Sequence, residues 1–168
     1  MLVKEWNELP DFMQVEEVKP YYDILKKKKL QLILKRIFDI VCSSILIILL
    51  SPILLILSIW IKLDSKGPVF YRQERITQYG KIFRIFKFRT MVTNADKIGT
   101  LVTTQNDSRI TKVGNKIRKC RLDELPQVFN IFLGDMSFVG TRPEVQKYVD
   151  AYTNEMLATL LLPAGVTS

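Results

Sequence analysis

The segment RKCRLDELP at residues 118–126 organises this chain, together with the apolar run that follows it up to Gly134. Two adjacent carboxylates, Asp123 and Glu124, lie within it among cationic side chains. A proline just after the carboxylates and a glycine at the end of an apolar run are typical of the first turn and the end of a helix. The pattern predicts that both carboxylates lie at the positive end of a helix, beside backbone N–H groups that can bind a phosphate.

The carboxylate pair has two interpretations. An ionised carboxylate beside anion-binding groups suits a nucleophile or a metal ligand in phosphate chemistry. An Asp that caps the helix, with a Glu that compensates the helix dipole, explains the same pattern. Because caps are commonplace, the spacing alone favours the capping interpretation, and both stay open at this point.

Composition limits the class of protein. A chain of 168 residues forms one domain with at most a small appendage. Its net charge of +8 favours anionic partners such as lipid headgroups, nucleotides or nucleic acid. It contains no histidine, which excludes His-based catalysis and His metal sites. Cys42 and Cys120 form no close-spaced pair, and we interpret both as reduced thiols in a cytoplasmic setting.

A long apolar stretch, Ile37 to Ile61, follows the basic run Lys26–Lys29. It exceeds the roughly 20 residues that a helix needs to cross a bilayer. Lys35 and Arg36 stand just before it, and further basic residues follow it. The positive-inside rule therefore places both flanks on the cytoplasmic side.

The pair Ser51-Pro52 falls in the middle of this stretch. Proline removes a backbone donor and clashes with the preceding turn, so the sequence predicts a break of the helix there. The Ser51 hydroxyl is a local partner for the backbone that the break exposes. A kinked helix that crosses the membrane once is one arrangement, and a re-entrant hairpin is the other. The charge of the two flanks favours the hairpin.

The remaining segments predict a small α+β unit. Residues 1–25 look like a loosely ordered or peripheral extension. Residues 68–76 and 81–89 read as a β-hairpin in which basic and aromatic residues interleave, a pattern that suits a nucleic-acid surface or, with an apolar segment just upstream, a membrane surface. Further along the chain the sequence predicts a short helix and a loop over residues 90–108, and helices over residues 110–121, 125–133 and 144–162.

The predicted fold is therefore α+β and mostly helical. We expect an extension over residues 1–25, a membrane-embedded helix over residues 26–66 that is re-entrant and broken at Ser51-Pro52, and a cytoplasmic catalytic domain over residues 67–168. That domain is expected to hold the β-hairpin and amphipathic interfacial helices.

A set of short motifs then recurs in a specific order. The motifs are KRIFD (35–39), SP (51–52), GPVF (67–70), FKFRTM (86–91), Asp107, Arg109, Thr111, Gly114, LDELPQ (122–127), Asn130, GDMS (134–137) and GTRP (140–143). With these residues the chain resembles the bacterial sugar transferases, which are monotopic polyprenyl-phosphate phosphoglycosyl transferases. The resemblance covers about residue 32 onward, and the combination is specific although each motif alone is weak.

The resemblance implies a reaction. The family transfers a sugar-1-phosphate from a nucleotide diphosphate sugar, usually UDP-linked, to a polyprenyl phosphate such as undecaprenyl phosphate, and releases UMP. It starts the assembly of capsule, O-antigen, exopolysaccharide or other glycans. By position, Asp123 looks like the nucleophile that forms a phosphosugar-enzyme intermediate, and Glu124 looks like its partner that, with Asp123, holds Mg²⁺.

The resemblance also implies binding residues and a location. Arg118 and Arg142 match phosphate- and nucleotide-sugar-binding positions. Lys87 and Arg89 of the basic motif are assigned to the same substrate. The resemblance further implies the re-entrant helix with both ends cytoplasmic, at the inner membrane, with the membrane and headgroup positions Lys35, Arg36, Asp39, Ser51 and Pro52. Expected partners are the bilayer, the lipid acceptor, the sugar donor and, as an option, a second copy of the chain. We expect no nucleic acid.

Three departures from the family pattern stand out. Arg121 occupies a position where Ser or Thr is usual, and Thr141 replaces the first proline of a Pro-Arg-Pro motif. The family continues beyond Pro163 into a section that helps to bind the nucleotide, so we expect the catalytic domain to be incomplete at its C-terminus. This leaves an inactive membrane-docked remnant, or one part of a split enzyme, as the alternative. A membrane-tethered nucleic-acid binder is a third class, which the carboxylate pair disfavours.

Overall fold

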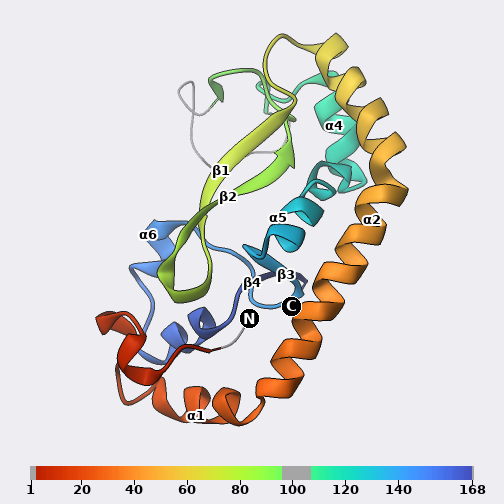
Figure 1. Ribbon diagram of the computed structural model, residues 1–168. Helices are drawn as coiled ribbons and strands as arrows, with labels where there is room; N and C mark the ends of the chain where they lie inside the picture. The colour runs from red at the N-terminus through yellow and green to blue at the C-terminus, as the bar shows by residue number, and fades with distance from the viewer. Residues whose placement is uncertain (1–2, 96–106, 168) are drawn as a thin grey trace.

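The computed structural model describes residues 3–95 and 107–167. One long helix, α2 (Lys29–Asp64), runs along one side of the molecule, and the other elements pack against it or against one another (Figure 1). They form two small two-stranded sheets, several short helices and an N-terminal segment. The predicted α+β, mostly helical class is confirmed. The residues between 95 and 107, within the predicted short helix and loop, lie outside the described part of the chain.

Helix α2 is continuous through Pro52, so the predicted break at this residue was wrong. Proline has no N–H, and the carbonyl that loses its helical partner is that of Ile48, four residues earlier. The Ser51 hydroxyl donates a hydrogen bond of 2.8 Å to this carbonyl oxygen of Ile48. The hydroxyl thus supplies the missing donor, as the sequence suggested, and it does so inside an unbroken helix.

Two faces of α2 have different surroundings. The inner face buries Leu54, Leu57 and Ile61 against Phe88 and Ile117. The outer face carries a run of exposed apolar side chains, which are Leu30, Ile33, Leu34, Ile37, Phe38, Ile40, Val41, Ile45, Ile48, Leu49, Ile53, Leu55, Ile56, Ile59, Trp60 and Leu63. Within the described residues α2 is the one helix that is long and apolar enough to cross a membrane.

The predicted β-hairpin is confirmed. Strand β1 (Phe70–Ile76) pairs antiparallel with β2 (Ile82–Phe88) across a tight turn. The buried amide of Asn130 fixes this hairpin to helix α5 (Gln127–Leu133), because its oxygen accepts from the Phe86 N–H at 2.8 Å and its nitrogen donates to the Arg84 carbonyl at 3.1 Å.

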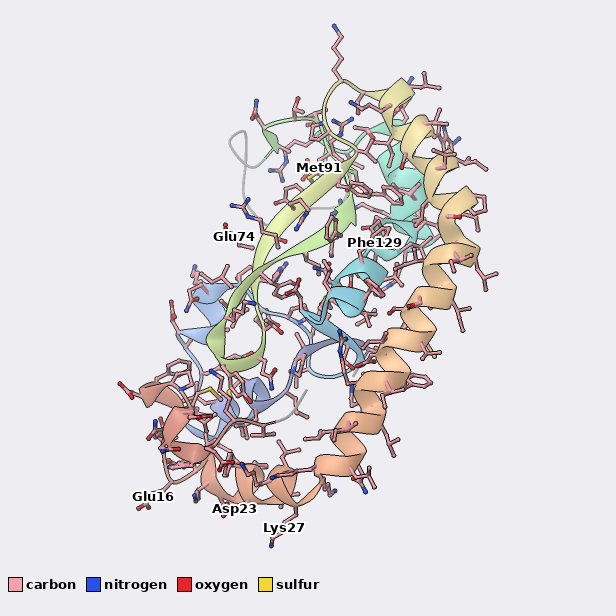
Figure 2. All side chains as sticks on the ribbon, in the orientation of Figure 1. Glu16, Asp23, Lys27, Glu74, Met91 and Phe129 are labelled. Carbon is pink, nitrogen blue, oxygen red and sulfur yellow. The ribbon has the colours of Figure 1, made fainter. Side chains whose placement is uncertain are left out.

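Two short helices enclose the carboxylate pair. Helix α4 (Lys112–Lys119) begins at Thr111, whose hydroxyl accepts from the Gly114 N–H as an N-cap. Helix α5 (Gln127–Leu133) ends at Gly134, which takes the left-handed conformation with φ of 93° that a side chain would strain. Phe129 on α5 packs between α2 and the hairpin (Figure 2). The sequence predicted both helices, with bounds two residues wider at both ends of α4 and at the start of α5.

The C-terminal region differs from its prediction. A single helix was expected over residues 144–162, but the structure has α6 (Gln146–Val149) and then a 3₁₀ segment, Glu155–Leu161. Between them the Thr153 hydroxyl accepts from the Met156 N–H, a local bond that competes with a continuous helix. The last strand, β4 (Ala164–Thr167), pairs parallel with β3 (Met136–Val139), a long-range pairing that no local pattern signals.

The N-terminal segment is ordered, which corrects the expectation of a loose extension. It contains two 3₁₀ turns, Trp6–Glu8 and Asp11–Met13, and helix α1 (Lys19–Lys27). Met13 and Val18 are fully buried and belong to the same apolar cluster as Leu160 and Leu161. This segment therefore completes a core of its own with the C-terminal region.

Candidate active site

Asp123 and Glu124 lie on a 3₁₀ turn, Leu122–Glu124, between α4 and α5. Arg121 starts the turn in the left-handed conformation, with φ of 53°, and its carbonyl accepts from the Glu124 N–H. The N-cap of α5 is Pro126, and no side chain caps it. Asp123 therefore does not cap α5, and that part of the capping interpretation is wrong.

Three cations from different parts of the chain surround the Glu124 carboxylate. Lys87 on β2 donates to Glu124 Oε1 at 3.0 Å. Arg142, which follows β3, lies 3.6 Å from the same oxygen, and Arg121 lies 3.9 Å from Oε2. Burial raises the pKa of Glu124, but the hydrogen bond and charge of Lys87, with the charges of the two arginines, outweigh it, so the pKa falls below its ordinary value.

Asp123 has a different electrostatic environment. Burial, and then the charge of Glu124, raise the pKa of Asp123 above its ordinary value, while Lys87 and Arg118 oppose the rise. The two carboxyls of the pair are therefore pushed in opposite directions. Such divergence is typical of catalytic carboxylate pairs with separate roles.

A pocket opens beside Glu124. It is lined by residues of the hairpin, of α5, of the loop after β3 and of β4, which are Arg75, Ile85, Lys87, Glu124, Gln127, Arg142, Pro143, Gly165 and Val166. Lys87 and Arg142, two of the predicted binding residues, thus lie in one pocket with the carboxylate. Arg118 lies on α4, near enough to Asp123 for its charge to lower the pKa of that carboxyl.

Arg89 has another role than the predicted substrate contact. It is buried, and its guanidinium donates to the Ser65 and Lys66 carbonyls, at 2.7 and 3.1 Å, just beyond the end of α2. Gly67 gives the guanidinium its room, because a Cβ there would lie 2.1 Å from Arg89 Nη1. Arg89 is 5% exposed and is not among the residues that line the pocket beside Glu124.

Lys35 and Arg36 also turn inward, contrary to the prediction that they contact lipid headgroups. Arg36 donates to the Ile131 and Phe132 carbonyls in the last turn of α5, at 2.7 and 2.9 Å. Lys35 donates to the Ser137 hydroxyl. Asp39 is 1% exposed and lies inside the molecule. Ser51 and Pro52 are exposed on α2, where a contact with lipid remains open to them.

Sequence reasoning missed two cations of the site. The family motif marks Arg121 only as a departure, yet its side chain lies beside Glu124. Arg75 lines the pocket and donates to the Pro143 carbonyl at 3.3 Å. Its position on a strand, in register with Phe83, carries no local signal of this role.

The metal-ligating side chains of the site decide whether a Mg²⁺ ion fits there. Within the described ranges, no group of three or more Asp, Glu, Cys or His side chains is arranged to hold a metal. Mg²⁺ usually binds to one or two carboxylates and to substrate phosphates, because it keeps much of its hydration. An adjacent carboxylate pair beside a cationic pocket fits such a shared site.

Comparison with known proteins agrees with this geometry. The family model described as "Bacterial sugar transferase" matches residues 30–168. The chain belongs to the bacterial sugar transferase family. The matched region begins at the second residue of α2 and includes every element of the site, whereas the folded N-terminal segment lies outside it.

Several curated proteins are similar to this chain. A UDP-N-acetylgalactosamine-undecaprenyl-phosphate N-acetylgalactosaminephosphotransferase of Aeromonas hydrophila is 45% identical over 123 residues, 73% of this chain and 29% of its own length. A UDP-glucose:undecaprenyl-phosphate glucose-1-phosphate transferase of Klebsiella pneumoniae is 45% identical over 125 residues, 73% of this chain and 26% of its own length. The exopolysaccharide production protein PSS of Rhizobium leguminosarum bv. phaseoli is 45% identical over 114 residues, 67% of this chain and 57% of its own length.

The opposed pKa shifts of the pair give a test. In Glu124→Gln, loss of the neighbouring negative charge lowers the pH at which Asp123 titrates, because that charge raises its pKa. In Lys87→Ala, loss of the nearby cation raises it. Carboxyl ¹³C NMR of protein labelled at aspartate measures both shifts. Glu74→Gln on β1 is the control and should change neither, and a shift of the same sign in both site variants would contradict the arrangement.

Proposed function

We propose that this chain transfers a sugar-1-phosphate from a UDP-sugar to a polyprenyl phosphate and releases UMP, as the first membrane step of polysaccharide or glycan assembly. The observation that carries the proposal is the carboxylate pair at the family's motif, with Lys87, Arg121 and Arg142 converging on Glu124. The named activities of the relatives support the acceptor and donor classes.

The side chains suggest a two-step reaction. In the first step a carboxylate oxygen of Asp123 attacks the phosphorus that carries the sugar, and the bond from this phosphorus to the bridging oxygen breaks, so that UMP leaves. In the second step a phosphate oxygen of the polyprenyl phosphate attacks the same phosphorus and frees Asp123. The product is a polyprenyl diphosphate sugar. A covalent intermediate lets the water-borne donor and the lipid acceptor arrive in turn.

The cations have a defined part in this reaction. Glu124 holds Lys87 and Arg142 together in the pocket, where they are poised for the phosphates of the donor. Arg118 favours the ionised form of Asp123 that attacks. Asp123 and Glu124 would be the residues that hold Mg²⁺, and the ion would supply further neutralisation of the diphosphate.

We also propose that α2 is embedded in the cytoplasmic leaflet of the inner membrane from one side. The Lys35–Asp39 part of α2 contacts β3 and α5, while Leu54–Ile61 packs on α4 and β2. A helix of 36 residues is about 54 Å long, against about 30 Å of hydrocarbon. If α2 crossed perpendicular to the membrane, parts of this polar domain would lie in hydrocarbon. An arrangement with both flanks of α2 on one side of the membrane, as the charge pattern predicts, keeps the polar domain out of the hydrocarbon.

Nucleotide release tests the reaction. The purified chain in nanodiscs should form UMP, not UDP, from one of a panel of UDP-sugars, with turnover that needs both undecaprenyl phosphate and Mg²⁺. Asp123→Asn should reduce turnover by about a thousandfold or more, because it removes the nucleophile. Asp150→Asn is the control and should keep the normal rate, because Asp150 is an exposed residue that directly follows α6. Formation of UDP, or near-normal turnover of Asp123→Asn, would contradict the mechanism.

Side-specific labelling tests the membrane arrangement. Single cysteines that replace Lys28 and Lys66, with Cys42 and Cys120 changed to Ser, lie just outside the two ends of α2. An impermeant thiol reagent applied to sealed inverted membrane vesicles should label both sites. Labelling of only one of them, with the other reached from the opposite side, would indicate a helix that crosses the membrane.

A further inference from the structure

Asp39 is the one charged residue in the apolar stretch from Ile37 to Ile61, and only 1% of it is exposed. A buried carboxylate is costly unless hydrogen bonds and an opposite charge compensate it. A charged residue inside such a segment is therefore usually paired with another group and has a function.

The hydrogen-bond donors to Asp39 lie on β3, 98 and 99 residues further along the chain. Ser137, which is fully buried, donates from its hydroxyl to Asp39 Oδ2 at 2.8 Å. The Phe138 N–H donates to Asp39 Oδ1 at 3.2 Å. Lys35, one turn earlier on α2, lies 3.7 Å from Asp39 Oδ2 and also donates to the Ser137 hydroxyl. Both carboxylate oxygens are thus used, and we call this set of contacts the Asp39 latch.

The latch joins α2 to the element that leads into the active site. After β3 the chain continues through Gly140 and Thr141 to Arg142, which lies 3.6 Å from Glu124 Oε1. Nearby on α2, Arg36 holds the end of α5, the helix that follows the carboxylate pair. Two polar attachments therefore fix the first half of α2 to both sides of the site.

The pocket beside Glu124 does not itself depend on α2. Among the described residues, those that line it come from the hairpin, the 3₁₀ turn, α5, the loop after β3 and β4, and none comes from α2. The backbone before Arg142 is held from the β4 side, because the Gly165 N–H donates to the Thr141 carbonyl at 2.7 Å. Loss of the latch should therefore leave the pocket in place and loosen α2 against β3, while Arg36 still binds the end of α5.

We propose that Asp39 is a positioning residue, which through Ser137 and the Phe138 N–H sets the register of α2 against β3 and so holds the carboxylate pair where a membrane-borne acceptor phosphate reaches it. This inference rests on the proposed function. The proposal predicts different effects on the two substrates, because the donor enters the pocket from water while the acceptor arrives through the leaflet that holds α2. A small displacement of a reacting group can cost about a hundredfold in rate.

The structure offers a matched control. Ser43 is also fully buried on α2, one turn after Asp39, but its hydroxyl donates to the Ile40 carbonyl of the same helix. Ser43→Ala therefore removes a buried polar group of α2 but no hydrogen bond to β3. Asp39→Asn keeps an acceptor oxygen and the side-chain shape, and serves as the milder variant if Asp39→Ala is poorly folded.

Kinetics in nanodiscs test the positioning role. Asp39→Ala should lower kcat/KM for undecaprenyl phosphate by at least about tenfold and leave the KM for the UDP-sugar within about twofold. Asp39→Asn should show a smaller loss of the same kind. Ser137→Ala should follow Asp39→Ala, and the double variant should lose little more than Asp39→Ala alone, because the two residues act together. Ser43→Ala should match the unchanged protein. Equal losses for donor and acceptor, or no loss for the acceptor, would overturn the proposal.

Hydrogen exchange tests the same contact without any activity. The Phe138 amide should exchange faster in Asp39→Ala than in the unchanged protein, and Ser43→Ala should leave its exchange unaltered. If the unchanged protein transferred no phosphosugar, the proposed function would fail while this measurement still decided the latch. Unaltered protection of Phe138 in Asp39→Ala would overturn it.

Discussion

Two neighbouring carboxylates in a half-buried turn repel each other, and the architecture around them is arranged to offset that repulsion. The hairpin brings Lys87, the turn itself presents Arg121, and the loop after β3 brings Arg142, so that three separate segments meet at Glu124. Asp123 receives less compensation, because burial and Glu124 raise its pKa against the opposing cations. One carboxylate thus organises the cations, and the other remains available for chemistry.

The same elements attach this site to the apolar helix. Arg36 binds the carbonyls at the end of α5, Arg89 binds those just beyond the end of α2, and Asp39 receives the Ser137 hydroxyl. Each contact places a charged group of one element on polar groups of another that would otherwise lack a partner. The helix and the site therefore form one unit. This unit suits a reaction whose two substrates come from different phases.

Local pattern was sufficient for some of this structure. The hairpin, α4, α5 and the glycine that ends α5 follow from alternation, helical spacing and capping, which act within a few residues. Other features depend on contacts between distant segments. No local pattern indicates that Arg89 and Arg36 bind carbonyls at helix ends, or that residues near Met13 pack in one cluster with Leu161. The break predicted at Pro52 failed because the Ser51 hydroxyl replaces the lost donor within the helix. For the site, the motif identified Asp123 and Glu124, but only the structure shows that the Arg121 side chain lies beside Glu124 and that Arg75 lines the same pocket.

The covalent role of Asp123 is the central claim, and mass spectrometry of the digested protein tests it most directly. The purified chain is incubated with the UDP-sugar that it turns over and Mg²⁺, without lipid acceptor, and then digested. The account predicts a mass increase of one sugar phosphate on the peptide that contains Asp123, which disappears when polyprenyl phosphate is added. Absence of the adduct while lipid-dependent turnover proceeds, or an adduct on another residue, would contradict it.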